Sequence, residues 1–133
     1  SVSFDTPVEA IKQHFGAINA RDPTAYIATM AFPFTYQNYD GVALTIASGA
    51  DCGTRSGPFP WDIILCTDPQ WSHSEFTDIH ELARTQYSAA YRVSFVRVDD
   101  QRDRSAVYDA IWIAVHNKDG WHVIYRHNMG LRP

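Results

Sequence analysis

The segment from Ser105 to His116 reads as a β-strand that is apolar on both faces. Successive strand residues point to opposite sides of a sheet, and a sheet that is covered on one side only has one polar face. The residues of one face are Val107, Asp109, Ile111, Ile113 and Val115, and those of the other are Ala106, Tyr108, Ala110, Trp112, Ala114 and His116. This pattern predicts helices over one face and a partner subunit over the other, a homodimer through the outer sheet face. The alternative is a sheet buried within one chain.

A helix is expected near the start of the chain. Thr6 can cap it, Pro7 suits its first position, and Glu9 completes a capping box. Apolar residues then recur at intervals of three and four as far as Ile18. The spacing therefore predicts an amphipathic helix that ends near residues 19–21.

A second helix and a hairpin should follow. Asp22, with a proline after it, caps a short helix that we expect to run through Met30 and to end at Pro33. Residues 34–39 alternate and are rich in aromatic side chains, which is typical of a strand. An Asp-Gly turn then predicts a returning strand over residues 42–47.

The remaining segments complete an α+β domain. A loop rich in Gly, Ser and Pro leads into an apolar segment, residues 61–66, which we expect to be a short helix. The strands expected after it cover residues 75–85, 87–98, 105–116 and 121–129. Helices followed by such a meander predict one curved antiparallel sheet with helices on one face. The length of 133 residues predicts a single domain over 1–133.

Charge and composition argue against several functions. The net charge of -4 disfavours a nucleic-acid interface, because phosphate contacts need clustered Lys and Arg. No apolar run approaches the roughly 20 residues of a membrane span, and no N-terminal segment has the pattern of a signal peptide. Cys52 and Cys66 stand alone, without a metal-ligand spacing or a disulfide framework. We therefore expect a reduced, cytoplasmic protein with no metal, no nucleic-acid partner and no membrane contact.

Aromatic side chains, which make up 14% of the chain, alternate with alanine on one face of the strand over 105–116. Small residues leave volume and the large rings between them line it, so the alternation predicts a concave surface. Strict alternation in the last strand puts Tyr125 and His127 on one apolar, aromatic face. A neutral imidazole there could accept or give a proton near pH 7.

The order of these elements, with the segment Gly-Trp-His-Val-Ile-Tyr-Arg-His near the end, resembles the nuclear transport factor two-like superfamily over about residues 5–129. Within it the chain is similar to the SnoaL-like polyketide cyclases, ketosteroid isomerase and limonene epoxide hydrolase. The resemblance implies a cystatin-like α+β barrel, in which three helices wrap a cone-shaped curved antiparallel sheet. It also implies an apolar pocket inside the cone and a dimer through the outer sheet face.

The resemblance places functional positions of these families on particular residues. The final-strand catalytic Asp of the epoxide hydrolase and the cyclases falls on His127, which disfavours epoxide hydrolysis by that mechanism. The Tyr that donates to the substrate oxyanion in ketosteroid isomerase falls on His14, and the protonated Asp of that enzyme falls on Trp112. The isomerase base falls on Asn38, with Asp40 two residues later. Asn is a poor base, so the isomerase mechanism is not intact, and with Trp112 in place of the protonated Asp the oxyanion machinery is absent as a set.

Each candidate residue has a structural alternative. His127 is expected to act as general base or acid, or else to be a core histidine satisfied by a Tyr hydroxyl or a carbonyl. His14 is expected to donate to a bound carbonyl, or else to lie on the helix surface. The residues expected to line the pocket, or else to pack the core, are Tyr36, Asn38, Tyr91, Trp112 and Tyr125. Asp109 is expected at the dimer interface, paired with Arg92 or Arg126.

The sequence leaves functions of different classes open. The first is a cofactor-independent enzyme that performs acid/base chemistry on an apolar cyclic or polyketide-like molecule: isomerisation, cyclisation, dehydration or hydrolysis. The second is a non-catalytic module that binds a small ligand or another protein, because a fold alone does not determine function. The third is a structural, dimer-forming subunit of a larger assembly.

Overall fold

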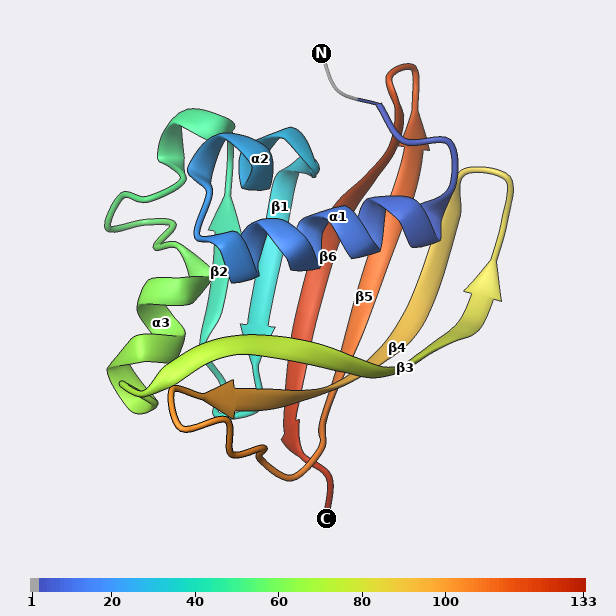
Figure 1. Ribbon diagram of the computed structural model, residues 1–133. Helices are drawn as coiled ribbons and strands as arrows, with labels where there is room; N and C mark the ends of the chain where they lie inside the picture. Colours follow the sequence, from blue (N-terminus) through green and yellow to red (C-terminus); the bar gives the residue numbers. More distant parts are fainter. Residues whose placement is uncertain (1–2) are drawn as a thin grey trace.

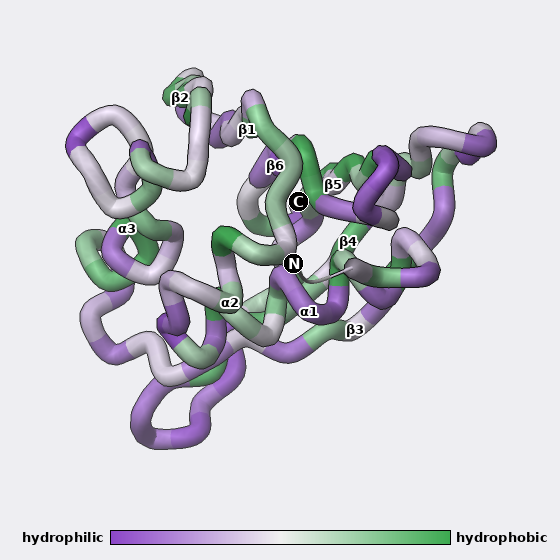
Figure 2. The backbone as a smooth tube through the Cα atoms, turned by 90° about the horizontal axis from the view of Figure 1, so that it is seen from above, coloured by the Kyte–Doolittle hydropathy of each residue, from purple (hydrophilic) through white to green (hydrophobic). Residues whose placement is uncertain are grey.

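The computed structural model describes residues 3–133, in which six strands form one curved sheet with three α-helices packed against it (Figure 1). The helices are α1 (Pro7–Ala20), α2 (Pro23–Ala28) and α3 (Pro60–Thr67). The strands are β1 (Met30–Asn38), β2 (Ala43–Ile46), β3 (Trp71–Arg84), β4 (Ser88–Asp99), β5 (Tyr108–Asn117) and β6 (Gly120–Leu131), in the spatial order β2-β1-β6-β5-β4-β3. Seen from above, the sheet curves around α1 (Figure 2). This is the predicted α+β architecture.

Side-chain caps start the first two helices where the sequence predicts them. The Thr6 hydroxyl accepts from the backbone N–H of Glu9 at 3.1 Å, and the Asp22 carboxylate accepts from that of Ala25 at 3.1 Å. Each such cap stabilises its helix by about 1 kcal/mol. At the other end of α1, Arg21 adopts φ 52° and its guanidinium donates to two carbonyls at the start of β3. The caps and this contact fix α1 across the sheet.

The start of β1 differs from the prediction. Helix α2 ends at Ala28 and the strand begins at Met30, whereas the sequence suggested a helix through Met30 that ends at Pro33. Pro33 instead lies within the strand, where the register with β6 shifts between Met30 and Thr35. Proline has no N–H to donate to a ladder, so an irregular part of a strand tolerates it.

The sheet is antiparallel in four of its five strand pairings, and the exception is the pair of β1 with β6, which is parallel. This corrects the expectation of a wholly antiparallel sheet. Hairpin turns force neighbouring strands to be antiparallel, but β1 and β6 are separated by most of the chain, so no turn fixes their relative direction.

A bulge in β6 reverses the faces predicted for the end of the chain. Val123 pairs with Ala114 while Tyr125 pairs with Ile113, so Ile124 is an extra residue without a partner. An extra residue shifts the alternation of the side chains after it, here as far as Asn128, because a second register shift follows between Asn128 and Gly130. Arg126, opposite Trp112, therefore faces the helices.

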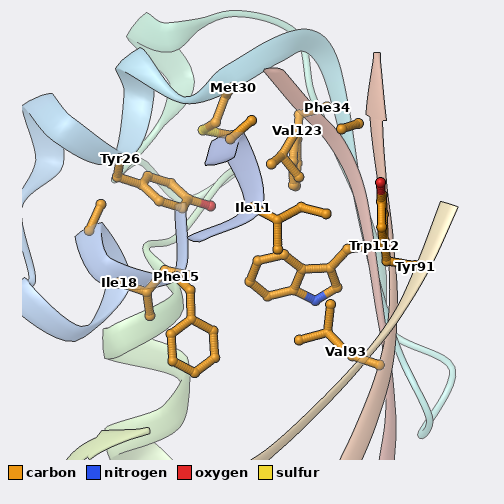
Figure 3. Packing of buried hydrophobic residues seen from close by; sticks show 14 of the residues in the cluster. Ile11, Phe15, Ile18, Tyr26, Met30, Phe34, Tyr91, Val93, Trp112 and Val123 are labelled. Atoms are coloured by element: carbon orange, nitrogen blue, oxygen red, sulfur yellow. The ribbon is translucent and has the colours of Figure 1, made fainter. Parts of the chain in front are cut away.

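The core lies between α1 and the concave face of the sheet (Figure 3). Ile11 and Phe15 of α1 pack toward Trp112 of β5, and Tyr26 reaches in from α2. Burying each such apolar side chain contributes about 1.5–3 kcal/mol. No helix within residues 3–133 is both long and apolar enough to cross a membrane.

Candidate functional site

A cavity of about 420 Å³ opens between the concave face of the sheet, the end of α1 and α3. Its apolar wall includes Phe15, Ile18, Ile63, Ile64, Phe95 and Trp112. The small Ala110 lies beside Trp112 on the same sheet face, as the alternation in β5 predicts. The wall can therefore accept a flat, apolar body such as a ring.

Most polar groups of the cavity come from four adjacent strands of the sheet. They are Tyr36 and Asn38 of β1, Arg97 of β4, Tyr108 of β5, and Arg126 and Asn128 of β6, while Asn19, Thr67 and Ser74 add polar side chains from α1, α3 and β3. The Tyr36 hydroxyl donates to the Asn38 side-chain oxygen at 3.3 Å. Two carboxylates, Asp40 and Asp68, also line the cavity, and Asp40 is exposed to solvent. Polar groups from four adjacent strands are thus brought together by the sheet.

Arg126 is the most buried charged residue at this site, with only 6% of its surface exposed. Its Nη1 donates to His14 Nε2 at 2.5 Å and to the Tyr26 hydroxyl at 2.9 Å. The rings of Tyr26, Phe34 and Tyr36 surround the guanidinium, with their centroids 5.0 to 5.6 Å from its central carbon. Such cation–π contacts hold a guanidinium in a defined orientation.

His14 is held neutral beneath Arg126. A guanidinium can only donate, so His14 Nε2 must accept and the ring proton lies on Nδ1. That Nδ1–H donates to the Thr29 hydroxyl at 2.7 Å, and the hydroxyl donates to the Tyr26 carbonyl at 2.7 Å. Complete burial, with the Arg126 charge adding to it, lowers the pKa of His14 well below its usual value of 6.5. This series of hydrogen bonds, from Arg126 through His14 and Thr29, fixes the orientation of the guanidinium.

The phenols next to Arg126 also remain uncharged. Burial raises the pKa of Tyr26 and of Tyr36, and the Arg126 charge opposes this rise without cancelling it. Neither hydroxyl therefore supplies a negative charge to balance the guanidinium at neutral pH.

The residues singled out from the sequence fall into three places. Tyr36, Asn38 and Trp112 line the cavity. His14 and Tyr91 are buried within the protein and are not among the lining residues. The Tyr91 hydroxyl donates to Glu81 at 2.8 Å, and burial followed by this carboxylate raises the pKa of Tyr91 to about 12.

His127 and Tyr125 lie on the opposite face of the sheet, which corrects their predicted position in the pocket. The extra residue Ile124 turns both of them outward. The Tyr125 hydroxyl and His127 Nδ1 both contact the side-chain oxygen of Gln37, at 3.1 and 3.0 Å. His127 is therefore not among the residues that line the cavity.

Sequence reasoning missed the two arginines of the cavity. Strict alternation puts Arg126 on the face opposite Tyr125 and His127, because a bulge leaves no mark in a pattern of alternation. For Arg97 a signal was present, since it shares the parity of Tyr91 in the strand over 87–98 and interrupts an otherwise apolar face. Asp109 was also given the wrong partner: it binds Arg132, at 2.8 Å, and neither Arg92 nor Arg126.

Known proteins resemble this chain in structure but not in sequence. No protein-family profile and no curated protein matches the sequence. A nuclear transport factor two-like protein of unknown function from Pseudomonas putida superposes with a TM-score of 0.67 at 14% identity, covering 95% of this chain and 83% of its own. The chain has the nuclear transport factor two-like fold.

Two further structures of this fold have different descriptions. A protein described as a calcium/calmodulin-dependent protein kinase type II association domain, from Thiobacillus denitrificans, has a TM-score of 0.77 at 17% identity and covers 99% of this chain and 100% of its own. A ketosteroid isomerase-like protein from Erwinia carotovora atroseptica has a TM-score of 0.61 at 12% identity, with coverages of 96% and 95%. At such identities the likeness extends to the fold and not to the activity.

Proposed function

We propose that this protein binds a small organic molecule with an apolar ring in the cavity between α3 and the sheet. The observation that carries the proposal is the composition of the lining, with rings and aliphatic side chains on one wall and side-chain donors at the strand ends. A volume of about 420 Å³ lies within the usual range of ligand pockets. The ring would lie on the apolar wall, and the polar groups would fix its orientation.

The binding proposal is preferred to acid/base catalysis by His127. That mechanism needs the imidazole within hydrogen-bonding reach of the substrate, and His127 is on the other face of the sheet. His14 is held neutral and fully occupied by Arg126 and Thr29. No cofactor is required for the proposed binding.

Calorimetric titration with cyclic compounds tests the proposal. We expect binding of flat bicyclic probes to the unmodified protein, and loss of binding in Ile64→Trp, because the larger ring would fill the cavity from α3. Leu82→Trp is the matched control, since Leu82 is 50% exposed on β3 and does not line the cavity. Equal binding by both variants would contradict the proposal.

A second candidate function is proton transfer on a cyclic ketone, as the likeness to a ketosteroid isomerase-like protein suggests. The candidate base is Asp40, a carboxylate at the cavity near Tyr36. Isomerisation of cyclohex-3-enone to its conjugated isomer, followed by ultraviolet absorbance, would test it. Turnover that is lost in Asp40→Asn and kept in Asp62→Asn, an exposed carboxylate on α3, would support this function; absence of turnover in the unmodified protein would exclude it for this substrate.

We also propose a homodimer through the outer sheet face. Ile111, Ile113 and Val115 form a half-buried apolar row on the side of β5 away from the helices. Sedimentation at micromolar concentration should give twice the 15.1 kDa mass of the chain, and Ile113→Lys should give the monomer. A monomer for the unmodified protein would overturn this proposal.

A further inference from the structure

The cavity contains two guanidinium groups without a carboxylate partner. Arg126 and Arg97 both line it, and neither forms an ion pair with any acidic residue within 3–133. Arg97 is half-buried, lies 4.4 Å from the centroid of the Tyr108 ring, and has a buried Nε with no acceptor among these residues. A guanidinium stays charged at all relevant pH values, so burial cannot neutralise either group.

Four of the seven arginines outside the cavity are paired with acids. Arg84, Arg92, Arg104 and Arg132 each contact a carboxylate, at distances from 2.5 to 3.4 Å, although all four side chains are between 42% and 54% exposed. Solvent already stabilises these exposed charges, so their pairs are worth little. The buried Arg126, which loses most of its solvent, is where a counter-charge would have the larger effect.

The hydrogens of Arg126 indicate where the missing group would bind. The neutral acceptors His14 and Tyr26 occupy Nη1. Within residues 3–133, no side chain or carbonyl accepts from Nε or Nη2, and the residue lines the cavity. A guanidinium presents its N–H groups as a rigid fork that matches the two oxygens of a carboxylate.

We propose that the ligand of this cavity is an organic carboxylate, with its carboxylate group bound by Arg126 and Arg97 and its ring on the wall formed by Phe15 and Trp112. The inference rests on the binding function proposed above and names the chemical class of the ligand.

The remaining polar lining is compatible with this orientation. The side-chain amides of Asn38 and Asn128 have oxygens that accept from Tyr36 and from a backbone N–H, so their NH₂ groups are the atoms available to a ligand. Asp40 and Asp68, the acidic residues of the lining, form no ion pair with either arginine. Each further negative charge on a ligand would increase its repulsion by these two carboxylates. The lining therefore favours a monoanionic carboxylate over a phosphate ester.

The test compares 2-naphthoate with 2-naphthamide by calorimetry at pH 7. The two compounds share a ring system and shape, and only the first is charged. We expect the unmodified protein to bind the carboxylate at least about tenfold more tightly, the usual advantage of a charge-assisted, bidentate contact. We expect Arg126→Gln and Arg97→Gln to weaken naphthoate binding with little change for the amide. Arg92→Gln, on the outer face of the same sheet, is the control and should leave both affinities unchanged.

The outcomes separate this inference from the proposed function. If the amide binds as tightly as naphthoate or more tightly, the proposal of a carboxylate ligand is wrong, while the proposed binding function still stands. Failure of both compounds to bind would overturn the binding function and this inference together. If Arg126→Gln does not fold, the comparison in the unmodified protein and the Arg97→Gln variant decide, since the half-buried Arg97 supports no internal network like that of Arg126. Unchanged naphthoate affinity in Arg97→Gln, together with no preference in the unmodified protein, would contradict the assignment.

Discussion

An arginine on the outer face of the sheet and an arginine on its inner face have different kinds of partner. On the outer face, Arg132 contacts the carboxylate of Asp109 at 2.8 Å, and the Ser94 hydroxyl donates to the same carboxylate at 2.7 Å. On the inner face, Arg126 is 6% exposed and its protein partners are the neutral His14 and Tyr26. Of these two arginines, the half-exposed one has a carboxylate partner and the buried one beside the cavity has none. A site that takes an anionic ligand would have this difference.

The largest expected difference between the faces is in packing. Trp112→Ala should lower the free energy of unfolding by about 3–5 kcal/mol, because a large buried ring would leave a void. Ile113→Ala changes the neighbouring residue, which is half-buried on the outer face. It should lower the free energy of unfolding by about 1 kcal/mol when the protein is dilute. Chemical denaturation measures both. A loss at Ile113 as large as that at Trp112 would show that the outer face is covered as completely as the inner one.

An intermediate effect is expected for the network behind Arg126. The folded-state pKa of His14 is lowered, so below pH 6.5 His14 binds a proton in the unfolded chain but stays neutral in the folded protein. The stability that neutral His14 contributes is thus fully present above pH 6.5 and is lost as the pH falls below it, by up to about 1.4 kcal/mol per pH unit. His14→Gln should remove that slope, measured as the stability of both proteins from pH 7 to pH 5. Parallel curves would show that His14 accepts a proton in the folded protein.

The smallest effect is expected on the outer face. Hydrogen bonds from Arg132, with one from Ser94, lower the pKa of Asp109 to about 2 from its usual 3.8. The stability contributed by the ionised carboxylate is therefore present above pH 3.8 and is lost as the pH falls toward 2. Asp109→Asn should be less stable than the unmodified protein at pH 6, and the difference should shrink as the pH falls from 3.8 toward 2. Because Arg132 is half-exposed, the effect should also shrink in high salt.

The sequence predicted most of the fold and less of the site. Local sequence signals were sufficient to predict features that depend only on neighbouring residues. Thr6 and Asp22 start helices, and the alternation in β5 places Trp112 on the inner face. The parallel pairing of β1 with β6 depends on contacts between the two ends of the chain, which no local pattern encodes. The single extra residue Ile124 has a larger consequence for function, because it moves His127 out of the cavity and Arg126 into it.

The assignment of the inner face as the binding face can be tested directly by nuclear magnetic resonance. Titration of 2-naphthoate into isotope-labelled protein should shift the indole N–H of Trp112 and the Nε–H of Arg126, which line the cavity, and leave the ring signals of His127 unchanged. Shifts at His127 and Tyr125, with the Trp112 and Arg126 signals unmoved, would place the ligand on the outer face and contradict the account.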